Sequence, residues 1–222
     1  MNSHLSTPTR AFILCAGKGE RLAPISWAIP KSLVPFWSEP ILDRTIMKLY
    51  SWGVKEILIN LNYKAEYIVA HIKNKFSNTH INFSFSYETY PMGTGGALWH
   101  AQWFINGQTP FWLINSDIIF DITPTSFIKA FKKDIVSVIW LTQAGGPRSV
   151  IVEGNSIKSF FNGTPQMNNS FTMCGVHLIS PNIKNYLRLN PPFSIVDSYI
   201  KAIHSGKMIV PLINSSCFWA DI

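Results

Sequence analysis

Short apolar runs alternate with stretches of helical periodicity through the first half of the chain. Apolar residues recur at helical intervals in residues 41–52 and 64–76, which predicts two helices, and Gly53 is a suitable stop for the first. Apolar or alternating runs predict strands at 12–14, 54–61, 81–87 and 111–114. A loop at 88–96 and a helix at 97–104 are predicted between the last two strands. This alternation predicts an α/β domain with three layers around a mixed, mainly parallel sheet.

The second half of the chain changes to a strand-rich pattern with turn residues between the strands. The predicted strands are 134–143, 149–153, 156–161, 171–179, 208–212 and 217–220. The predicted turns are 145–147, 153–155 and 162–164. Helices are predicted around 182–189 and 195–204. No linker, repeat or low-complexity tract interrupts this order, so we expect a single domain over residues 1–222, with a polar tail at 1–10.

The amino-acid composition is typical of a folded protein without membrane spans or disulfide bonds. Hydrophobic residues make up 47% and charged residues 14% of the chain, so long disorder is not expected. No apolar stretch approaches the roughly 20 residues needed to span a bilayer, and residues 1–10 lack a signal-peptide core, so we expect a cytoplasmic protein without a membrane partner. The three cysteines are widely spaced and predict neither a disulfide framework nor a zinc site. Eight tryptophans and 15 phenylalanines leave a homo-oligomer among the partners to consider.

The net charge of +7 raises the question of a nucleic-acid partner. The lysines are scattered, however, and no nucleic-acid motif is present, so we expect no nucleic acid. The densest pair, Lys132-Lys133, closes a predicted amphipathic helix. Attraction of a polyanionic small substrate explains the excess of positive charge equally well.

A glycine-rich segment follows the first predicted strand. Gly17 and Gly19 can adopt backbone geometries that point several N–H groups into one concavity, which suits an anion. Arg21 and Lys31, each near a proline, add full positive charges that a phosphate-rich ligand can use. The dinucleotide fingerprint is not met, because Leu22 stands where the third glycine is required, and the spacing of the common phosphate-binding loop is absent. Two glycines alone would equally suit a tight turn.

The longer sequence from residue 17 to residue 35 favours a phosphate-binding loop over a simple tight turn. G-K-G-E-R-L at 17–22, followed by P-K-S-L-V-P at 30–35, resembles the opening signature of the sugar nucleotidylyltransferases, also called sugar-1-phosphate pyrophosphorylases. The residues of this signature are similar to those of N-acetylmuramate-1-phosphate uridylyltransferases and mannose-1-phosphate guanylyltransferases. The resemblance covers residues 11–222 and implies a Rossmann-like fold. It implies a nucleotide-binding half at 11–133 and a sugar-phosphate-binding half at 134–222.

The activity implied by the resemblance joins a nucleoside triphosphate and a sugar 1-phosphate to give a nucleotide-sugar and pyrophosphate. Arg21 and Lys31 would be the catalytic cations, with Arg21 on the leaving pyrophosphate and Lys31 near the reacting phosphorus. Backbone N–H groups would cradle the triphosphate. The residues implied to bind the nucleotide are Ala16, Gly17, Lys18, Gly19, Glu20, Gly93, Thr94 and Gly95.

Two carboxylates are the candidate ligands of Mg²⁺. Asp117 directly follows a buried strand, where open α/β sheets bind ligands, although an aspartate there can also cap a turn. The resemblance implies that Asp117 is one metal ligand, with Ser116 in place of the more usual glycine. Asp221, in the segment W-A-D-I, matches the second metal ligand. The sequence stops at Ile222, before the family's Gly-Thr-Pro, so truncation stays open.

One stretch and two single residues are the remaining candidates. The stretch 93–98 resembles the family's nucleoside-binding loop and should pass a backbone close to a ligand before a helix. Glu88 is assigned to base or sugar recognition, with an exposed acidic loop residue as the alternative. Gly175 matches a strand end near the sugar phosphate, whereas the family's E-K-P segment is not evident near 161–163.

Two other functions remain open at this point. One is a non-catalytic nucleotide-sugar sensor or regulatory subunit of a pyrophosphorylase. The other is a phosphocholine cytidylyltransferase of the same fold. Retention of Arg21, Lys31, Asp117 and Asp221 favours the enzyme, because a binder does not need both metal carboxylates. The motifs specify neither the nucleobase nor the sugar.

Overall fold

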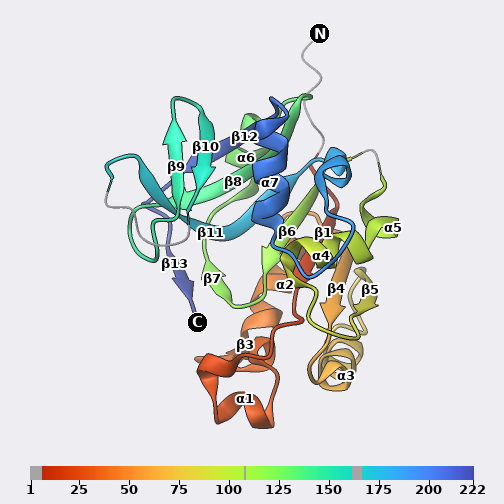
Figure 1. Ribbon diagram of the computed structural model, residues 1–222. Helices are drawn as coiled ribbons and strands as arrows, with labels where there is room; N and C mark the ends of the chain where they lie inside the picture. Colours follow the sequence, from red (N-terminus) through yellow and green to blue (C-terminus); the bar gives the residue numbers. More distant parts are fainter. Residues whose placement is uncertain (1–6, 108, 162–166) are drawn as a thin grey trace.

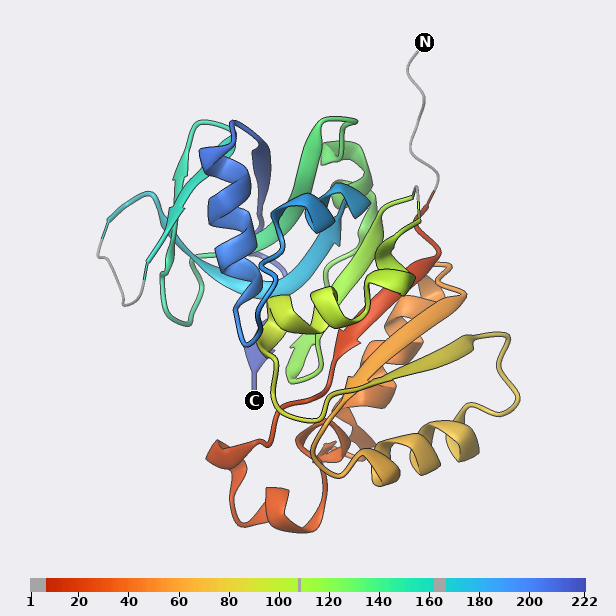
Figure 2. The same ribbon diagram turned by 45° about the vertical axis from the view of Figure 1, so that its right-hand side comes forward.

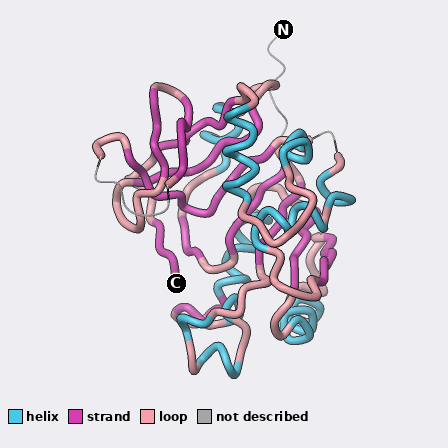
Figure 3. The backbone as a smooth tube through the Cα atoms, in the orientation of Figure 1, coloured by secondary structure: helices cyan, strands magenta, loops and turns pink. Residues whose placement is uncertain are grey.

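The protein is built on one large mixed sheet with helices on both faces. The computed structural model describes residues 7–107, 109–161 and 167–222. The sheet order is β10-β9-β11-β6-β1-β4-β5, with β8 beside β11 and β12 beside β8. Figure 1 shows these strands crossing the middle of the molecule, and Figure 3 separates them by colour from the surrounding helices. The predicted three-layer α/β class is confirmed.

The strands of this sheet begin and end close to the predicted positions. They are β1 (Arg10–Leu14), β4 (Glu56–Leu61), β5 (Asn82–Tyr87), β6 (Phe111–Asn115), β8 (Ile135–Thr142), β9 (Val150–Glu153), β10 (Ser156–Phe160), β11 (Ser170–Ile179) and β12 (Met208–Ile213). Four neighbours, β6, β1, β4 and β5, are parallel. β11 runs antiparallel between β6 and β8, and β12 is parallel to β8. Arg10, placed in the predicted tail, is the first residue of β1.

Two small ribbons lie outside the main sheet. One pairs β2 (Pro35–Phe36) with β3 (Glu39–Pro40). The other pairs β7 (Ile118–Phe120) with β13 (Trp219–Asp221), so that Asp221 lies opposite Ile118. β13 therefore begins two residues later and ends one residue later than the strand predicted at 217–220, and β7 is an element that the pattern missed.

The helices divide between the two faces of the sheet. One layer has α2 (Ile41–Ser51), α3 (Ala65–Lys75) and α6 (Pro124–Ala130), and the other has α4 (Gly93–His100), α5 (Gln102–Ile105) and α7 (Ile195–His204). Each layer packs on its own buried core, so that Ile13 of β1 belongs to one core and its neighbour Phe12 to the other. Figure 2 shows α4 and α7 on one side of the strands and α2 and α3 on the other.

Short elements surround the segment between β1 and α2. They are η1 (Glu20–Leu22), α1 (Ile25–Ala28) and η2 (Lys31–Leu33), and a further 3₁₀ helix, η3 (Pro181–Tyr186), lies near α7. The predicted helix at 182–189 is thus a shorter 3₁₀ segment, which begins at Pro181 with Ser180 accepting from the Asn182 amide. Figure 1 shows α1 and β3 in a lobe that projects below the sheet.

Two sequence expectations need correction or fall outside the described residues. Residues 93–96 were expected in a loop, but they form the first turn of α4, and the predicted helix at 97–104 is two helices, α4 and α5. The predicted turn at 162–164 lies outside the described residues. Among the described residues, no helix is both long and apolar enough to cross a membrane.

Candidate active site

The glycine-rich loop leaves β1 beside the carboxyl end of β6. β1 lies between β4 and β6, and the chain reaches β6 only after forming β4 and β5 on the other side. Strand order therefore reverses between β1 and β6, which is where open α/β sheets bind ligands. Gly17 and Lys18 are exposed, and the described chain offers no acceptor to the amides of Gly17, Lys18 and Gly19. These N–H groups can bind an anion.

Gly19 connects this loop to Lys31. Its backbone has a φ of +67°, a conformation that residues with a Cβ rarely adopt. A Cβ at Gly19 would lie 2.7 Å from the Cβ of Lys31. The loop and η2 are therefore in direct contact, and the glycine makes this close approach available.

Lys31 forms the central ion pair of the site. Its Nζ lies 2.9 Å from Oδ2 of Asp117, and the two side chains are 11% and 29% exposed. Such a pair, largely out of water, is geometrically better defined than a surface pair. Asp117 occupies the turn between β6 and β7, at the edge where the loop leaves β1. Two residues 86 positions apart in the sequence thus lie side by side at this edge of the sheet.

Asp221 reaches the same place through the β7–β13 ribbon. The amide of Ile222 donates to the Asp117 carbonyl over 3.0 Å, and Trp219 Nε1 donates to the Cys174 carbonyl over 2.9 Å, which anchors β13 on β11. Burial and the negative charge of Asp117 raise the pKa of the Asp221 carboxyl, while Lys31 and Arg21 oppose the shift. The carboxylates of Asp117 and Asp221 are therefore close enough to interact.

Arg21 is the more loosely held cation. Its Nη2 lies 4.0 Å from Oδ1 of Asp221, with side chains 76% and 42% exposed. A pair this long and this solvated adds little stability, so the guanidinium is available to another anion. Lys31 is fixed at the floor of the site, whereas Arg21 lies at its open side.

The donor set fits a divalent cation. Two neighbouring carboxylates supply the oxygen ligands that Mg²⁺ accepts, and such ions are commonly completed by water and phosphate oxygens. No group of three or more histidine, cysteine or acidic side chains suited to a metal is found in the described part of the chain. A cation at Asp117 and Asp221 would therefore depend on ligand oxygens for the rest of its shell.

The glycines of 93–96 are explained by contacts within the protein. A Cβ at Gly93 would lie 2.5 Å from the Phe193 carbonyl oxygen, and one at Gly95 would lie 2.5 Å from the Phe193 ring. The Gly95 and Gly96 amides donate to that same carbonyl over 3.0 and 3.3 Å. Thr94 accepts from the Ile195 amide over 2.8 Å at the start of α7. The close backbone approach predicted for a ligand is thus made by residues 193–195, and contact with a nucleoside stays a prediction.

Glu88 and Gly175 lie inside the protein. Glu88 is only 6% exposed, so the alternative of an exposed acidic loop residue is wrong. Gly175 is buried at a φ of +74°, in an irregular part of β11, and a Cβ there would lie 2.8 Å from Asn115 Nδ2. The sugar-phosphate roles of both residues stay predictions.

Two residues that the motifs did not indicate hold the site together. Asn60, at the end of β4, accepts from the Cys15 amide through Oδ1 over 2.7 Å, immediately before the glycine-rich loop. Lys64 donates through Nζ to the Trp27 and Ala28 carbonyls over 2.7 and 2.9 Å, and so ties α1 to the start of α3. Neither belongs to a sequence signature; only the expectation that polar residues at strand ends are functional could have indicated Asn60.

The buried cysteine and histidine side chains take no part in this site. Burial raises the pKa of the Cys15 thiol to about 12, which leaves it neutral beneath the loop. Burial lowers the pKa of His177 to about 3, and its Nδ1 lies 2.9 Å from the Tyr199 hydroxyl. Both groups are buried parts of the core.

Comparison with known families identifies the class of this fold. The sequence profile of the nucleotidyl transferase family matches residues 10–146. The chain is 26% identical, over its whole length, to the catalytic subunit beta of mannose-1-phosphate guanylyltransferase from Drosophila pseudoobscura pseudoobscura, and covers 61% of that relative. It is 30% identical to mannose-1-phosphate guanyltransferase from Yarrowia lipolytica, over 82% of this chain and 52% of the relative. The chain thus spans little more than half the length of these curated relatives.

Solved structures share the fold at low sequence identity. A putative glucose-1-phosphate thymidylyltransferase from Bacillus anthracis superposes with a TM-score of 0.83 at 20% identity, covering 96% of this chain and 89% of that one. HddC from Yersinia pseudotuberculosis, complexed with GMP-PN, superposes with a TM-score of 0.76 at 24% identity, covering 96% and 93%. The sheet and both helical layers therefore belong to an established architecture.

Proposed function

Because the chain belongs to the nucleotidyl transferase family, we propose that it joins a nucleoside triphosphate to a sugar 1-phosphate and releases pyrophosphate. One observation carries the proposal: Arg21, Lys31, Asp117 and Asp221 converge beside the free amides of the glycine-rich loop. This arrangement of fixed positive charge, backbone donors and paired carboxylates suits two polyanionic substrates.

The reaction is a displacement at phosphorus. An oxygen of the sugar phosphate forms a bond to the α-phosphorus of the triphosphate while the bond from that phosphorus to the pyrophosphate oxygen breaks. The electron pair of the breaking bond leaves with pyrophosphate, and no covalent enzyme intermediate is needed. Positioning and charge neutralisation can provide most of the rate acceleration for such a transfer.

The residues of this chain have separate tasks in the proposed reaction. The amides of residues 17–19 hold the triphosphate, and Arg21, at the open side, neutralises the departing pyrophosphate. Lys31, fixed by Gly19 and Asp117, places one positive charge at the floor of the site. Asp117 and Asp221 would hold Mg²⁺, which when bound supplies positive charge to phosphate oxygens. Residues 93–95 at the start of α4 are proposed to lie against the nucleoside, and Gly175 on the sugar-phosphate side.

The first substrate pair to test is GTP with mannose 1-phosphate, because the two curated relatives are named for that pair of substrates. Other nucleoside triphosphates, other sugar 1-phosphates and phosphocholine complete the panel. Pyrophosphate release is measured with Mg²⁺ and again with excess chelator. Release with at least one pair, abolished by chelator, is expected. If the folded protein releases no pyrophosphate with any substrate pair of the panel, that result would overturn the enzymatic proposal and favour a nucleotide-sugar sensor.

Two substitutions test the roles of the ion pair. Lys31→Met and Asp117→Asn each remove one charge with little change in size, and each should lower kcat by roughly 10²–10³-fold, the usual effect of losing one preorganised electrostatic group. Lys201→Met, on the exposed side of α7, is the matched control and should retain full activity. Near-normal turnover of either site variant would remove that residue from the reaction.

A further inference from the structure

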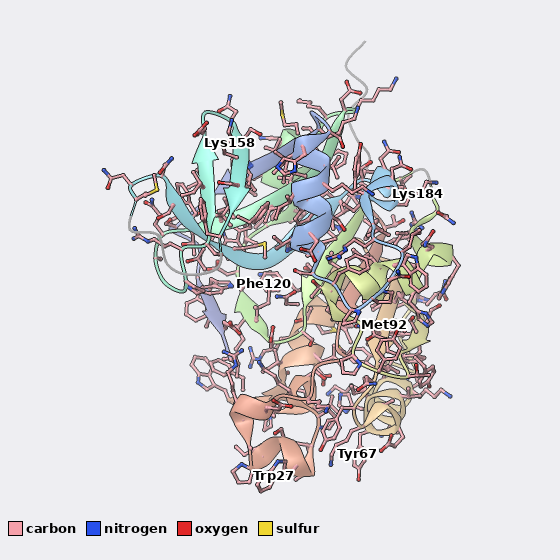
Figure 4. All side chains as sticks on the ribbon, in the orientation of Figure 1. Trp27, Tyr67, Met92, Phe120, Lys158 and Lys184 are labelled. Atoms are coloured by element: carbon pink, nitrogen blue, oxygen red, sulfur yellow. The ribbon has the colours of Figure 1, made fainter. Side chains whose placement is uncertain are left out.

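A buried carboxylate links the glycine-rich loop to the start of α4. Glu88 Oε1 accepts from Asn60 Nδ2 over 2.6 Å, and Glu88 Oε2 accepts from the Met92 amide over 3.0 Å. Asn60 Oδ1 in turn accepts from the Cys15 amide over 2.7 Å. One continuous chain of hydrogen bonds therefore runs from the end of β1, through β4, to the residue that precedes Gly93. Figure 4 labels Met92 on the side of the sheet where α4 lies.

The direction of every hydrogen bond in this chain is fixed. A backbone amide can only donate, so Cys15 requires the oxygen of the Asn60 side chain and leaves its NH₂ group facing Glu88. Residue 88 then receives a donor from Asn60 at one atom and a donor from Met92 at the other. Only a side chain that accepts at both ends satisfies both neighbours, and an ionised glutamate does so. Both neighbours are buried, with Asn60 3% and Met92 5% exposed, so water cannot replace either partner.

We infer that Glu88 is a positioning residue, which sets the glycine-rich loop and the start of α4 at a fixed separation. The inference rests on the proposed function, because those two segments are the proposed contacts for the triphosphate and the nucleoside. It assigns Glu88 an action through Asn60 and Met92 rather than through contact with substrate. Its two oxygens already have protein partners, and Asn62 Nδ2 holds its backbone carbonyl over 2.8 Å.

An exchange of the acid and the amide tests this inference. In Glu88→Gln, one end of the side chain at position 88 becomes a hydrogen-bond donor. Whichever way the Asn60 and Gln side-chain amides are rotated, two donors then face each other at one contact of the chain between the Cys15 and Met92 amides. In Asn60→Asp, two carboxylates face each other across the 2.6 Å contact. The double variant Asn60→Asp/Glu88→Gln restores every partner: the introduced carboxylate accepts from Cys15 and from the introduced amide, whose oxygen accepts from Met92. Net charge is the same as in the natural chain.

Hydrogen exchange reports on the network without any substrate. The Cys15 and Met92 amides should exchange about tenfold faster or more in each single variant, because each leaves the buried network with mismatched partners. Protection should return in the double variant. The amide of Ile139, in the core of the sheet, should be unaffected, and exposed Glu153→Gln is the control substitution. Failure of the double variant to restore protection at both amides would overturn the network.

Kinetics then separate positioning from two other roles. At a temperature where every variant is folded, each single variant should lose about 10- to 100-fold in kcat/KM for the triphosphate, since misplacement by about 1 Å has effects of that size. The double variant should recover most of the loss. If Glu88 instead reads the nucleobase, the double variant stays impaired and nucleotide preference changes, because its carboxylate is still missing from position 88. If the network only stabilises the fold, kcat and KM stay normal while Tm falls. Either result would overturn the positioning role.

The two proposals fail in distinguishable ways. In the first case, the natural chain is inactive, but its Cys15 and Met92 amides are protected, lose protection in the single variants and regain it in the double variant. This result would leave the network in place and remove the enzymatic function. An active natural chain whose single variants keep normal kinetics would leave the function in place and remove the positioning role.

Discussion

Replacing Gly19 with alanine should disable the site through Lys31. The backbone at Gly19 has a φ of +67°, and the new Cβ would lie 2.7 Å from the Lys31 Cβ. Carbon atoms in ordinary contact lie about 3.5–4.0 Å apart, so one of the two must move by about 1 Å. Lys31 has little freedom to move without loss, because its Nζ is paired with Asp117 over 2.9 Å.

The expected effect has two parts that a control can separate. A residue with a Cβ in the left-handed region costs about 1–2 kcal/mol, which for a chain of this size lowers Tm by roughly 2–8 °C. Gly154, in the turn between β9 and β10, has a φ of +58° and open space around its missing Cβ. Gly154→Ala therefore measures backbone strain alone. Displacement of Lys31 by about 1 Å should add a fall in kcat of roughly 100-fold, which Gly154→Ala does not share.

The assay is pyrophosphate release by both variants with saturating substrates and Mg²⁺, well below both Tm values. Circular dichroism melts give the shared loss of stability. A Gly19→Ala protein that turns over as fast as Gly154→Ala would show that the new Cβ does not displace Lys31. A loss of activity only in proportion to the fraction unfolded would show the same.

Three further predictions concern pH and two contacts. In the folded chain, burial lowers the pKa of His177 to about 3, so the ring stays neutral down to that pH, whereas in the unfolded chain it takes up a proton near pH 6.5. The free energy of unfolding should therefore fall as pH drops below 6.5, by about 2 kcal/mol at pH 5. Denaturant titrations of His177→Gln should show a flatter dependence of this free energy on pH, and an unchanged dependence would contradict the prediction. Lys64→Met removes two hydrogen bonds to the end of α1, so the amide hydrogens of residues 20–30 should exchange faster. KM for the triphosphate should rise a few-fold, which corresponds to roughly 1 kcal/mol. Exposed Lys73→Met is the control, and equal hydrogen exchange in both variants would show that Lys64 does not hold α1 in place. Thr94→Val removes the acceptor for the Ile195 amide and should lower stability by about 1 kcal/mol, whereas Thr94→Ser should not, as Tm will show.

Local patterns predicted the elements of the sheet and α7 well. The predicted helix at 195–204 has the observed bounds, because helical spacing coincides with a strong start at Ser194, whose side chain accepts from the Val196 amide. The strand–helix alternation predicted the layer order for a similar reason: buried parallel strands have continuous apolar runs that turn residues interrupt.

Residues 93–96 show where local reasoning fails. Glycines are poor helix formers, so a loop was the natural expectation. In the structure, Phe193 lies so close that side chains would collide, and its carbonyl accepts the Gly95 and Gly96 amides at the start of α4. A contact between positions almost a hundred residues apart thus decides the local conformation, and no local pattern encodes it.

The candidate site was predictable as a set of residues but not as a geometry. The motif strings identified Lys31 and Asp117, and their 2.9 Å ion pair is in keeping with a shared site. The burial of Glu88 was not predictable, because its hydrogen-bond donors come from separate segments of the chain. Asn60 had no signature at all, since its importance arises from the one amide that it binds.

The ribbon of β7 and β13 gives the site an order of assembly. Asp117 and Asp221 lie nearly half the chain apart, and the second carboxylate arrives only when β13 pairs with β7. Contacts between such distant segments form slowly, because chain entropy is lost before the contacts are gained. A folding chain can therefore complete the glycine-rich loop and Lys31 before it can complete the pair of carboxylates. By linkage, a ligand that bridges the two carboxylates would stabilise this long-range pairing against unfolding.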